Sequence, residues 1–326
     1  MRKKPVRFGV CLFPLQFISP KSDLQTQTEK IIEAARLSEE CHLDSYWVID
    51  HLLTALDRYR LPVLEPLILL SVLSARTTSI RMGTSILIMP LRNPILLAKE
   101  LATLDVLSSG RLTLGAAAGW CKEEFDVCGI PFHKRGKMFD EQLAILKRLW
   151  AEDNLTYKGN FFSFSNVTIE PKPVQKPGLP IWVGAEDLTL EAPLKRIVTL
   201  GDGWLGVTSP RHYKEGLGRI DELAHKVGRD PESLETANFT YTMVDSNSDV
   251  ARQKAREVLD QVHSQPVMQR VERLLIAGTP EEVASKIQNQ INAGVRYVIL
   301  NLLSNDPQII PYVSEKVLPK IDANPD

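Results

Sequence analysis

The sequence predicts a barrel of eight parallel β-strands surrounded by α-helices. Short runs of β-branched and aromatic residues alternate eight times with longer segments in which apolar residues recur every three or four positions. Such sustained alternation is typical of parallel strands joined by helical crossovers. The 326 residues also exceed the roughly 250 that a (β/α)8 barrel needs, which leaves about 75 for insertions and terminal helices.

The strand runs are rich in valine, isoleucine, leucine and aromatic residues, and most of them end at proline, glycine or a polar pair. Short apolar runs bounded in this way are typical of buried parallel strands. The expected strands are residues 6–13, 46–49, 80–88, 112–114, 181–183, 203–205, 235–244 and 295–300.

Amphipathic helices are expected between these strands. In residues 24–41, Ile31 and Ala35 belong to one apolar stripe with charged residues on either side. Pro94 opens another helix at a position where its missing N–H has no intrahelical partner. The expected helices are residues 24–41, 65–75, 94–109, 135–150, 211–227, 249–263 and 280–293, with one more that follows Gly184-Ala185 and ends near Leu200.

The whole chain, residues 1–326, is expected to form one barrel domain. Residues 152–179 interrupt the alternation of strands and helices. Aromatic and β-branched residues alternate with polar ones around Lys158-Gly159-Asn160, and several prolines follow. We interpret this segment as a hairpin-like insertion between the fourth helix and the fifth strand. The loops 51–62 and 263–279 accommodate further residues, and an open doubly wound sheet is the alternative architecture.

Composition excludes several function classes. The net charge of −1 lacks the basic excess that nucleic-acid binding requires. The four cysteines form no CxxC pair and have no histidine at zinc-site spacing, which favours a reduced, cytoplasmic protein without a metal centre. No apolar run approaches the roughly eighteen residues of a membrane helix, so no membrane partner is expected.

In barrels of this kind the site is built from loops at the carboxyl ends of the strands. Those ends carry the sequence's most informative residues. They are Phe13 and Pro14, Asp50 and His51, residues 85–89, residues 115–120, residues 184–187 and residues 205–209.

The segment GAAAG at residues 115–119 resembles a dinucleotide-binding fingerprint, but it lacks the middle glycine and the acidic residue about twenty positions later. We therefore interpret Gly115 and Gly119 as places where the backbone passes close to a cofactor or its pocket wall. At Gly184-Ala185 a strand is followed by a predicted helix, so backbone N–H groups and the helix dipole are expected to hold a phosphate there.

Several longer segments follow one another in a recognisable order. They are WVIDH at 47–51, LEPLILLSVLSARTTSIRMGTS at 64–85, RNP with LAKELATLDVLSSGRLTLGAAAGW at 92–120, EF and GIPFHKRG up to 136, EPKPVQKPGLPIWVGA at 170–185, GDGW at 201–204 and GTPEEVASKIQNQINAGVRYVIL at 278–300. In their order and spacing these segments resemble the luciferase-like monooxygenase superfamily, whose members are flavin- or deazaflavin-dependent (β/α)8 enzymes. The resemblance covers nearly the whole chain.

This resemblance implies a redox enzyme. With reduced FMN and O2 it would insert an oxygen atom into a small organic substrate, and with coenzyme F420 it would transfer a hydride; the sequence does not choose between them. The resemblance also implies a non-proline cis peptide at Ser85-Ile86 against the cofactor ring, and a phosphate at Gly184-Ala185, where relatives have two glycines. The expected cofactor-binding residues are Phe13, Ser85, Ile86, Gly115, Gly119, Trp120, Gly184 and Ala185.

His51 and Asp50 are the expected catalytic residues. The imidazole titrates near neutral pH and can exchange protons with a substrate. A deazaflavin-dependent sugar-phosphate dehydrogenase branch of the superfamily has the same Asp-His pair and uses the histidine, although a structural histidine is the alternative. Trp120 stands where that branch has a glutamate acid, so the sugar-phosphate reaction is not expected here, unless Glu123 or Glu124 substitutes for that acid in part.

Trp120 is expected to form a wall of the pocket, stack on the substrate or ring, or pack against Trp47. Four basic residues near the same pocket would surround an anionic cofactor tail or form a solvated rim. They are Arg92, His133, Lys134 and Arg135.

The expected partners are a small-molecule substrate, a separate flavin reductase if the cofactor is FMN, and a second copy of the chain in a homodimer or higher oligomer. Two other functions remain open from the sequence. One is a flavin-binding protein without turnover, and the other is a cofactor-independent barrel lyase or isomerase.

Overall fold

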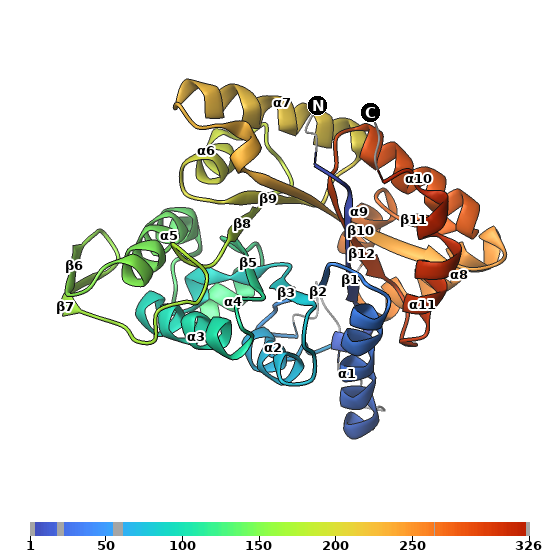
Figure 1. Cartoon of the computed structure of the whole chain (residues 1–326), viewed down its shortest axis with the longest axis horizontal. Helices are drawn as coiled ribbons and strands as arrows, with labels where there is room; N and C mark the ends of the chain where they lie inside the picture. Colours follow the sequence, from blue (N-terminus) through green and yellow to red (C-terminus); the bar gives the residue numbers. More distant parts are fainter. Residues whose placement is uncertain (1–3, 18–22, 55–60, 264, 324–326) are drawn as a thin grey trace.

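The computed structural model describes residues 4–17, 23–54, 61–263 and 265–323. Within these residues, eight parallel strands close into a barrel (Figure 1). In order round the ring they are β1 (Arg7–Leu12), β2 (Ser45–Val48), β3 (Arg81–Thr84), β5 (Leu112–Ala117), β8 (Ile181–Gly184), β9 (Gly203–Gly206), β10 (Glu235–Val244) and β12 (Tyr297–Leu302).

The ring closes because β10 pairs with both β9 and β12, and β12 pairs with β1. All of these pairings are parallel, with Val10 opposite Leu300 and Ala237 opposite Leu205. The predicted barrel is confirmed, and the open doubly wound sheet is wrong.

Helices surround the barrel and follow the predicted order (Figure 1). Asn93 caps one of them by accepting the backbone N–H groups of Ile95 and Leu96, with Pro94 in its first turn. The helices that join successive barrel strands are α1 (Leu24–Glu40), α2 (Pro66–Ser74), α3 (Pro94–Leu107), α5 (Arg135–Ala151), α6 (Glu191–Thr199), α7 (Pro210–Lys226), α8 (Ser248–Val262) and α10 (Pro280–Asn292).

Shorter elements complete the described chain. They are α4 (Lys122–Val127), α9 (Gln265–Glu272), α11 (Ile309–Lys316), and 3-10 helices at Pro14–Gln16, Met89–Leu91, Phe132–Lys134, Pro231–Ser233 and Leu318–Lys320. No helix in the described ranges has both the length and the apolar character needed to cross a membrane.

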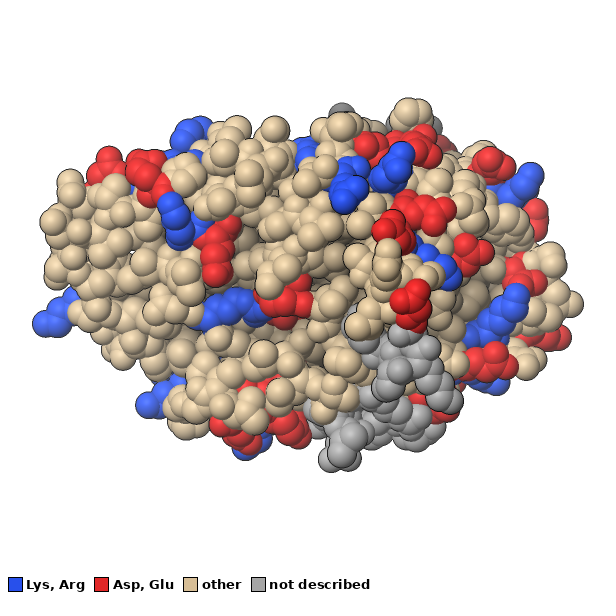
Figure 2. Space-filling view, turned by 90° about the horizontal axis from the view of Figure 1, so that it is seen from below, with Lys and Arg blue, Asp and Glu red and all other residues tan. Residues whose placement is uncertain are grey.

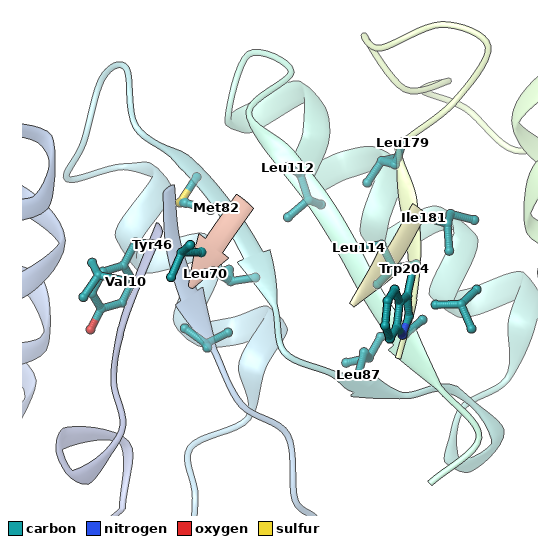
Figure 3. Packing of buried hydrophobic residues seen from close by; sticks show 14 of the residues in the cluster. Val10, Tyr46, Leu70, Met82, Leu87, Leu112, Leu114, Leu179, Ile181 and Trp204 are labelled. Carbon is teal, nitrogen blue, oxygen red and sulfur yellow. The ribbon is translucent and has the colours of Figure 1, made fainter. Parts of the chain in front are cut away.

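Strand alternation divides the core into two layers. Outward-facing side chains such as Tyr46, Met82 and Leu114 pack against the surrounding helices (Figure 3). Inward-facing side chains fill the barrel, where the rings of Trp47 and Trp182 lie 5.3 Å apart. The interior is therefore a packed core below the carboxyl ends of the strands.

The third predicted strand, residues 80–88, is interrupted. β3 ends at Thr84, and β4 (Leu87–Ile88) continues beside β5 after the peptide bond Ser85-Ile86, which is cis. This geometry was expected from the resemblance, and it is confirmed.

Two other boundaries differ from the prediction. The fourth barrel strand, β5, continues through Gly115 and Ala116 to Ala117, where the sequence predicted a loop. Helix α6 begins only at Glu191, so it does not directly follow Gly184-Ala185.

The insertion contains the predicted hairpin. Strands β6 (Leu155–Lys158) and β7 (Ser163–Val167) pair antiparallel beside α5. The buried carboxylate of Glu141 on α5 accepts the backbone N–H groups of Asn160, at 3.0 Å, and of Phe162, at 2.9 Å. This carboxylate attaches the hairpin turn to the barrel.

The loop 263–279 also has structure that the sequence did not indicate. Helix α9 is followed by the short strand β11 (Ile276–Gly278), which pairs parallel with the end of β10. The segment is thereby fixed at the carboxyl-end rim of the barrel.

Candidate functional site

A cavity of about 550 Å³ opens at the carboxyl ends of the barrel strands. Figure 2 shows a hollow at the centre of one face of the molecule, with acidic and basic side chains intermingled around largely uncharged surface. Almost all of the predicted site residues line the cavity. They are Phe13, Asp50, His51, Ser85, Ile86, Gly119, Trp120, Gly184 and Ala185.

Gly115 is the predicted site residue that does not line the cavity. A Cβ at this position would lie 1.9 Å from the carbonyl oxygen of Thr84, whose hydroxyl donates to the Gly115 carbonyl at 2.7 Å. Glycine is therefore needed for the close packing of β3 against β5. Gly119 has a φ of +80°, and a Cβ there would meet Ile88.

His51 lies in the cavity wall and is paired with Glu124. Nδ1 of the imidazole is 3.0 Å from Oε1 of this glutamate, and the two side chains are 8% and 0% exposed. The same Oε1 accepts the backbone N–H of Leu52 at 2.7 Å. An ionised carboxylate only accepts hydrogen bonds, so we assign the proton to Nδ1 of His51. Nε2 is then the nitrogen that can accept a proton.

Glu124 comes from α4, which begins two residues after Trp120. From the sequence, Glu124 was expected only as a substitute for a missing acid. The only signal in the sequence is its place after the GAAAGW segment, and this does not reveal a partner 73 residues away.

Asp50 is occupied by structural contacts. Its two carboxylate oxygens accept hydrogen bonds from the guanidinium of Arg92 at 2.7 and 3.1 Å. One of them also accepts a hydrogen bond from the backbone N–H of Ile88 at 2.8 Å. Arg92 binds Glu65 as well, at 3.0 Å, and does not line the cavity. Asp50 thus holds β4, which follows the cis peptide, in place.

Trp120 walls the cavity beside His51. The two rings are 5.8 Å apart in an edge-to-face arrangement. Trp120 does not pack on Trp47, whose aromatic neighbours are Trp182 and Tyr297 in the barrel interior.

One end of the cavity is aromatic and apolar. Phe13 lies 5.9 Å from Tyr241 and 5.3 Å from His263, centroid to centroid, and Phe239 packs edge-to-face on Tyr241. Burial, with a smaller contribution from His51, lowers the pKa of His263 to about 3, so this ring is neutral. Three further residues of this wall come from the segment between the barrel strands β10 and β12. They are Val267 and Val271 on α9, and Leu274, which follows that helix.

The opposite end of the cavity is charged. Among the predicted basic residues, His133 and Arg135 line it, whereas Lys134 does not. Arg196 of α6 lines the same end, as do Glu186 and Asp187. Arg196 was not among the residues expected from the sequence.

Gly184 and Ala185 form part of the wall between these ends. A Cβ on Gly184 would lie 2.8 Å from Cγ2 of Ile86, so glycine permits this close approach. The backbone N–H of Ala185 donates to the carbonyl of Leu205 at 3.2 Å. That donor is used within the barrel and is not directed at a ligand.

The described residues contain no group of three or more His, Cys, Asp or Glu side chains that could hold a metal ion. The chemistry that the cavity itself offers is proton exchange at His51, next to apolar walls and an end that carries both basic and acidic side chains.

Comparisons with known proteins identify the family. Residues 6–297 match the model of the luciferase-like monooxygenase family. An uncharacterised protein of Mycobacterium tuberculosis is 36% identical over 176 residues, a match that covers 53% of this chain and 60% of that protein. The F420-dependent glucose-6-phosphate dehydrogenase of Microbacterium testaceum is 26% identical over 336 residues, covering 94% and 98%.

Among solved structures, monooxygenase RslO1 from Streptomyces bottropensis superposes with a TM-score of 0.84 over 96% of this chain and 99% of its own, at 23% identity. That similarity establishes the fold. Since the family model spans most of the sequence, the chain belongs to the luciferase-like monooxygenase family.

Proposed function

We propose that the protein is an oxidoreductase that uses a flavin-type cofactor, FMN or coenzyme F420, to oxidise a small organic substrate. One observation carries the proposal: His51, Ile86, Gly119 and Gly184, each from a segment that resembles the family, converge on a single cavity at the carboxyl ends of the strands. Relatives with F420-dependent and monooxygenase names support both forms of the chemistry.

The cavity fits such a cofactor. Its volume of about 550 Å³ lies within the range of roughly 300–1,000 Å³ typical of small-molecule sites. Ala117, Ala118 and Gly119 present little side chain to the cavity, and Gly184 and Ala185 lie beside them at the end of the neighbouring strand β8. These small residues leave room for a planar ring, and Ile86 and Ser85 would contact it.

When bound, the cofactor would supply hydride exchange as F420, or reduction of O2 for oxygen insertion as FMN. His51 would hold or accept the proton that the substrate gains or loses, through Nε2. Glu124 would keep the imidazole in the required tautomer and stabilise its protonated form. Trp120 would exclude water from the proton-exchanging edge.

The aromatic end is the proposed place for the substrate. Phe13, Phe239 and Tyr241 offer apolar ring surface, which suits a small organic molecule. Because tryptophan at position 120 cannot donate a proton as a carboxylic acid would, the sugar-phosphate reaction of the Microbacterium relative is not proposed for this chain.

The test is titration of the purified protein with FMN and with F420, followed by fluorescence. We expect saturable binding of at least one of them, and its loss in Ile86→Glu, since a carboxylate would replace the apolar wall. Val174→Glu, at a 52% exposed site outside the cavity, is the matched control. Unchanged affinities in Ile86→Glu contradict the ring site.

Measurements of turnover distinguish an FMN-dependent enzyme, an F420-dependent enzyme and a binding protein without activity. Substrate-dependent consumption of reduced FMN with O2, or of F420 without O2, distinguishes the two chemistries and excludes a binding protein without turnover. Absence of binding to both cofactors would favour a cofactor-independent lyase or isomerase.

The proposal extends to the cellular setting. We propose a cytoplasmic homodimer or higher oligomer, and, for the FMN form, supply of reduced flavin by a separate reductase. The exposed apolar side chains of Ile68 on α2 and Leu96 on α3 support association of two copies.

A further inference from the structure

Tyr241 places a phenol hydroxyl at the aromatic end of the cavity. Phe13 and Phe239 each lie edge-to-face against its ring, with centroids 5.9 Å away, and Val267 lines the same wall. A tyrosine hydroxyl in such apolar surroundings usually has a hydrogen-bond partner. Within the described ranges, however, no residue of the chain forms a hydrogen bond with the hydroxyl of Tyr241. This group is therefore available to a ligand.

The hydroxyl of Tyr241 is protonated. Burial, with a smaller contribution from Cys11, raises the pKa of Tyr241. A protonated phenol donates one hydrogen bond and can accept others. The other side chains that the structure places at this end of the cavity are uncharged. A carboxylate or phosphate bound there would lose its water without gaining a counter-ion, which favours an uncharged oxygen.

Asn301 places a buried amide beside this tyrosine. Its position on β12 pairs with Tyr241 on β10 and with Cys11 on β1, and these side chains face the barrel interior, as does that of Ile299. Because neighbouring strands lie about 4.8 Å apart, side chains at paired positions on one face are neighbours. The Asn301 side chain is fully buried, and neither its oxygen nor its nitrogen has a hydrogen-bond partner in the part of the chain that the structure describes.

The neighbouring polar side chains of the barrel interior, Cys11 and Gln16, are hydrogen-bonded within the protein. Nε2 of Gln16 donates to Sγ of Cys11 at 3.1 Å, and Oε1 of Gln16 accepts the backbone N–H of Ile49 at 2.7 Å. A buried amide without partners destabilises a fold, and such groups are rare in native proteins. The free donor and acceptor of Asn301 therefore indicate hydrogen bonds to a group from outside the chain.

We propose that Tyr241 and Asn301 form a subsite that binds an uncharged oxygen of the substrate, in a carbonyl or hydroxyl group. This inference rests on the proposed function and names the substrate class that the aromatic end selects. Tyr241 donates a hydrogen bond to that oxygen. Asn301 does not line the cavity, so it acts as a positioning residue, joined to the phenol by an internal water.

The experiment compares two ligands of the same shape that differ in one oxygen. Cyclohexanone and methylenecyclohexane are titrated by calorimetry into the purified protein, saturated with whichever of FMN and F420 it binds. In Tyr241→Phe, the affinity for cyclohexanone should fall roughly 3- to 10-fold, the effect of one lost neutral hydrogen bond, while the affinity for methylenecyclohexane changes by less than about 2-fold. Cyclohexanol and methylcyclohexane test the hydroxyl group in the same way.

A second variant tests the positioning role of Asn301. Asn301→Leu keeps the side-chain volume and removes both polar atoms, so the affinity for cyclohexanone should fall roughly 2- to 5-fold. Added to Tyr241→Phe, the same substitution should cause no further loss, because Asn301 acts through the phenol. Tyr157→Phe is the control, since Tyr157 stacks on Phe164 in the insertion, outside the cavity. Thermal unfolding of each variant checks that the fold is intact, and Asn301→Val replaces Asn301→Leu if the latter does not fold.

The subsite is overturned if Tyr241→Phe weakens both members of a pair equally, if it weakens neither, or if cyclohexanone does not bind. Equal losses from Asn301→Leu in the presence and absence of the Tyr241 hydroxyl overturn the positioning role. If the protein binds neither FMN nor F420, the proposed function fails, and the same titrations of the unliganded protein then decide the subsite separately.

Discussion

Nδ1 of His51 lies 3.0 Å from Oε1 of Glu124, and this contact joins the end of the second barrel strand to the helix that follows the fourth. Because the carboxylate is fully buried and also accepts the N–H of Leu52, it defines both the orientation and the tautomer of the imidazole. A residue placed in this way acts on chemistry through another residue and need not touch the substrate.

Glu124→Gln should retain the fold and reduce turnover. The amide can still accept the Leu52 N–H, but it removes the negative charge that stabilises protonated His51. We expect kcat to fall roughly 10-fold or more with cofactor affinity unchanged, and the ring ¹⁵N shifts of His51 to move towards a mixture of tautomers. Glu123→Gln is the matched control, and equal kinetics and equal ¹⁵N spectra for the two variants would refute this role.

His263 predicts how stability depends on pH. Its pKa of about 3 in the folded protein lies below the unfolded value near 6.5, so below pH 6.5 the unfolded chain binds the proton that the native ring does not. The contribution of His263 to the free energy of unfolding is therefore fully present above pH 6.5, and it is lost as the pH decreases towards 3. This one residue should account for about 2 kcal/mol of loss between pH 7 and pH 5.

His263→Phe keeps a ring against Phe13 and removes the titration. Urea unfolding at pH 7 and pH 5 should show a smaller decrease in unfolding free energy for this variant than for the unmodified protein. His225→Asn, at an exposed position on α7, should leave the pH dependence unchanged. The interpretation is wrong if His263→Phe and the unmodified protein lose the same free energy.

Glu141 predicts the local stability of the insertion. Glu141→Ala leaves the N–H groups of the hairpin turn at Asn160 and Phe162 without their acceptor, and each such bond to a charged group contributes about 1.5–3 kcal/mol. Limited proteolysis within residues 152–179 should therefore become roughly 100-fold faster or more. Glu152→Ala, which removes an exposed ion pair with Arg148, serves for comparison; equal cleavage rates would contradict the assignment.

Exposed apolar side chains predict the oligomeric state. Ile68 is 68% exposed and Val72 40% exposed on α2, and Leu96 is 59% exposed and Leu107 63% exposed on the adjoining α3. Ile68→Lys should shift the sedimentation coefficient from that of a dimer towards that of a monomer. Val174→Lys, in the insertion, should not. A monomeric unmodified protein at micromolar concentration would exclude this interface.

The periodicity of the sequence predicted the barrel because its signals are local. The strand 235–244 was placed correctly, since six of its ten residues are β-branched or aromatic. The fourth strand was predicted too short because Gly115 and Ala116 have low strand propensity, and only the close approach of Thr84 explains their place in β5.

The residues of the candidate site also fall into those that a local pattern indicates and those that only distant contacts reveal. Residues that follow strands, such as His51 and Trp120, were found because strand ends meet at one rim. Glu124 and Arg196 were not found, because their roles arise from contacts between distant segments. Asp50 was predicted as catalytic from its neighbour His51, although its bonds to Arg92 and Ile88 give it a structural role that no local pattern indicates.

Helix α9 lies between the barrel strands β10 and β12 in the chain, yet the ring closes without it. Its residues Val267 and Val271 nevertheless form part of the cavity wall. Substitutions at these two positions can change the shape of the cavity while every barrel hydrogen bond and the contact of His51 with Glu124 remain in place. Under the proposed function, selection for a new substrate can therefore act on this one segment, separately from the proton exchange proposed for His51.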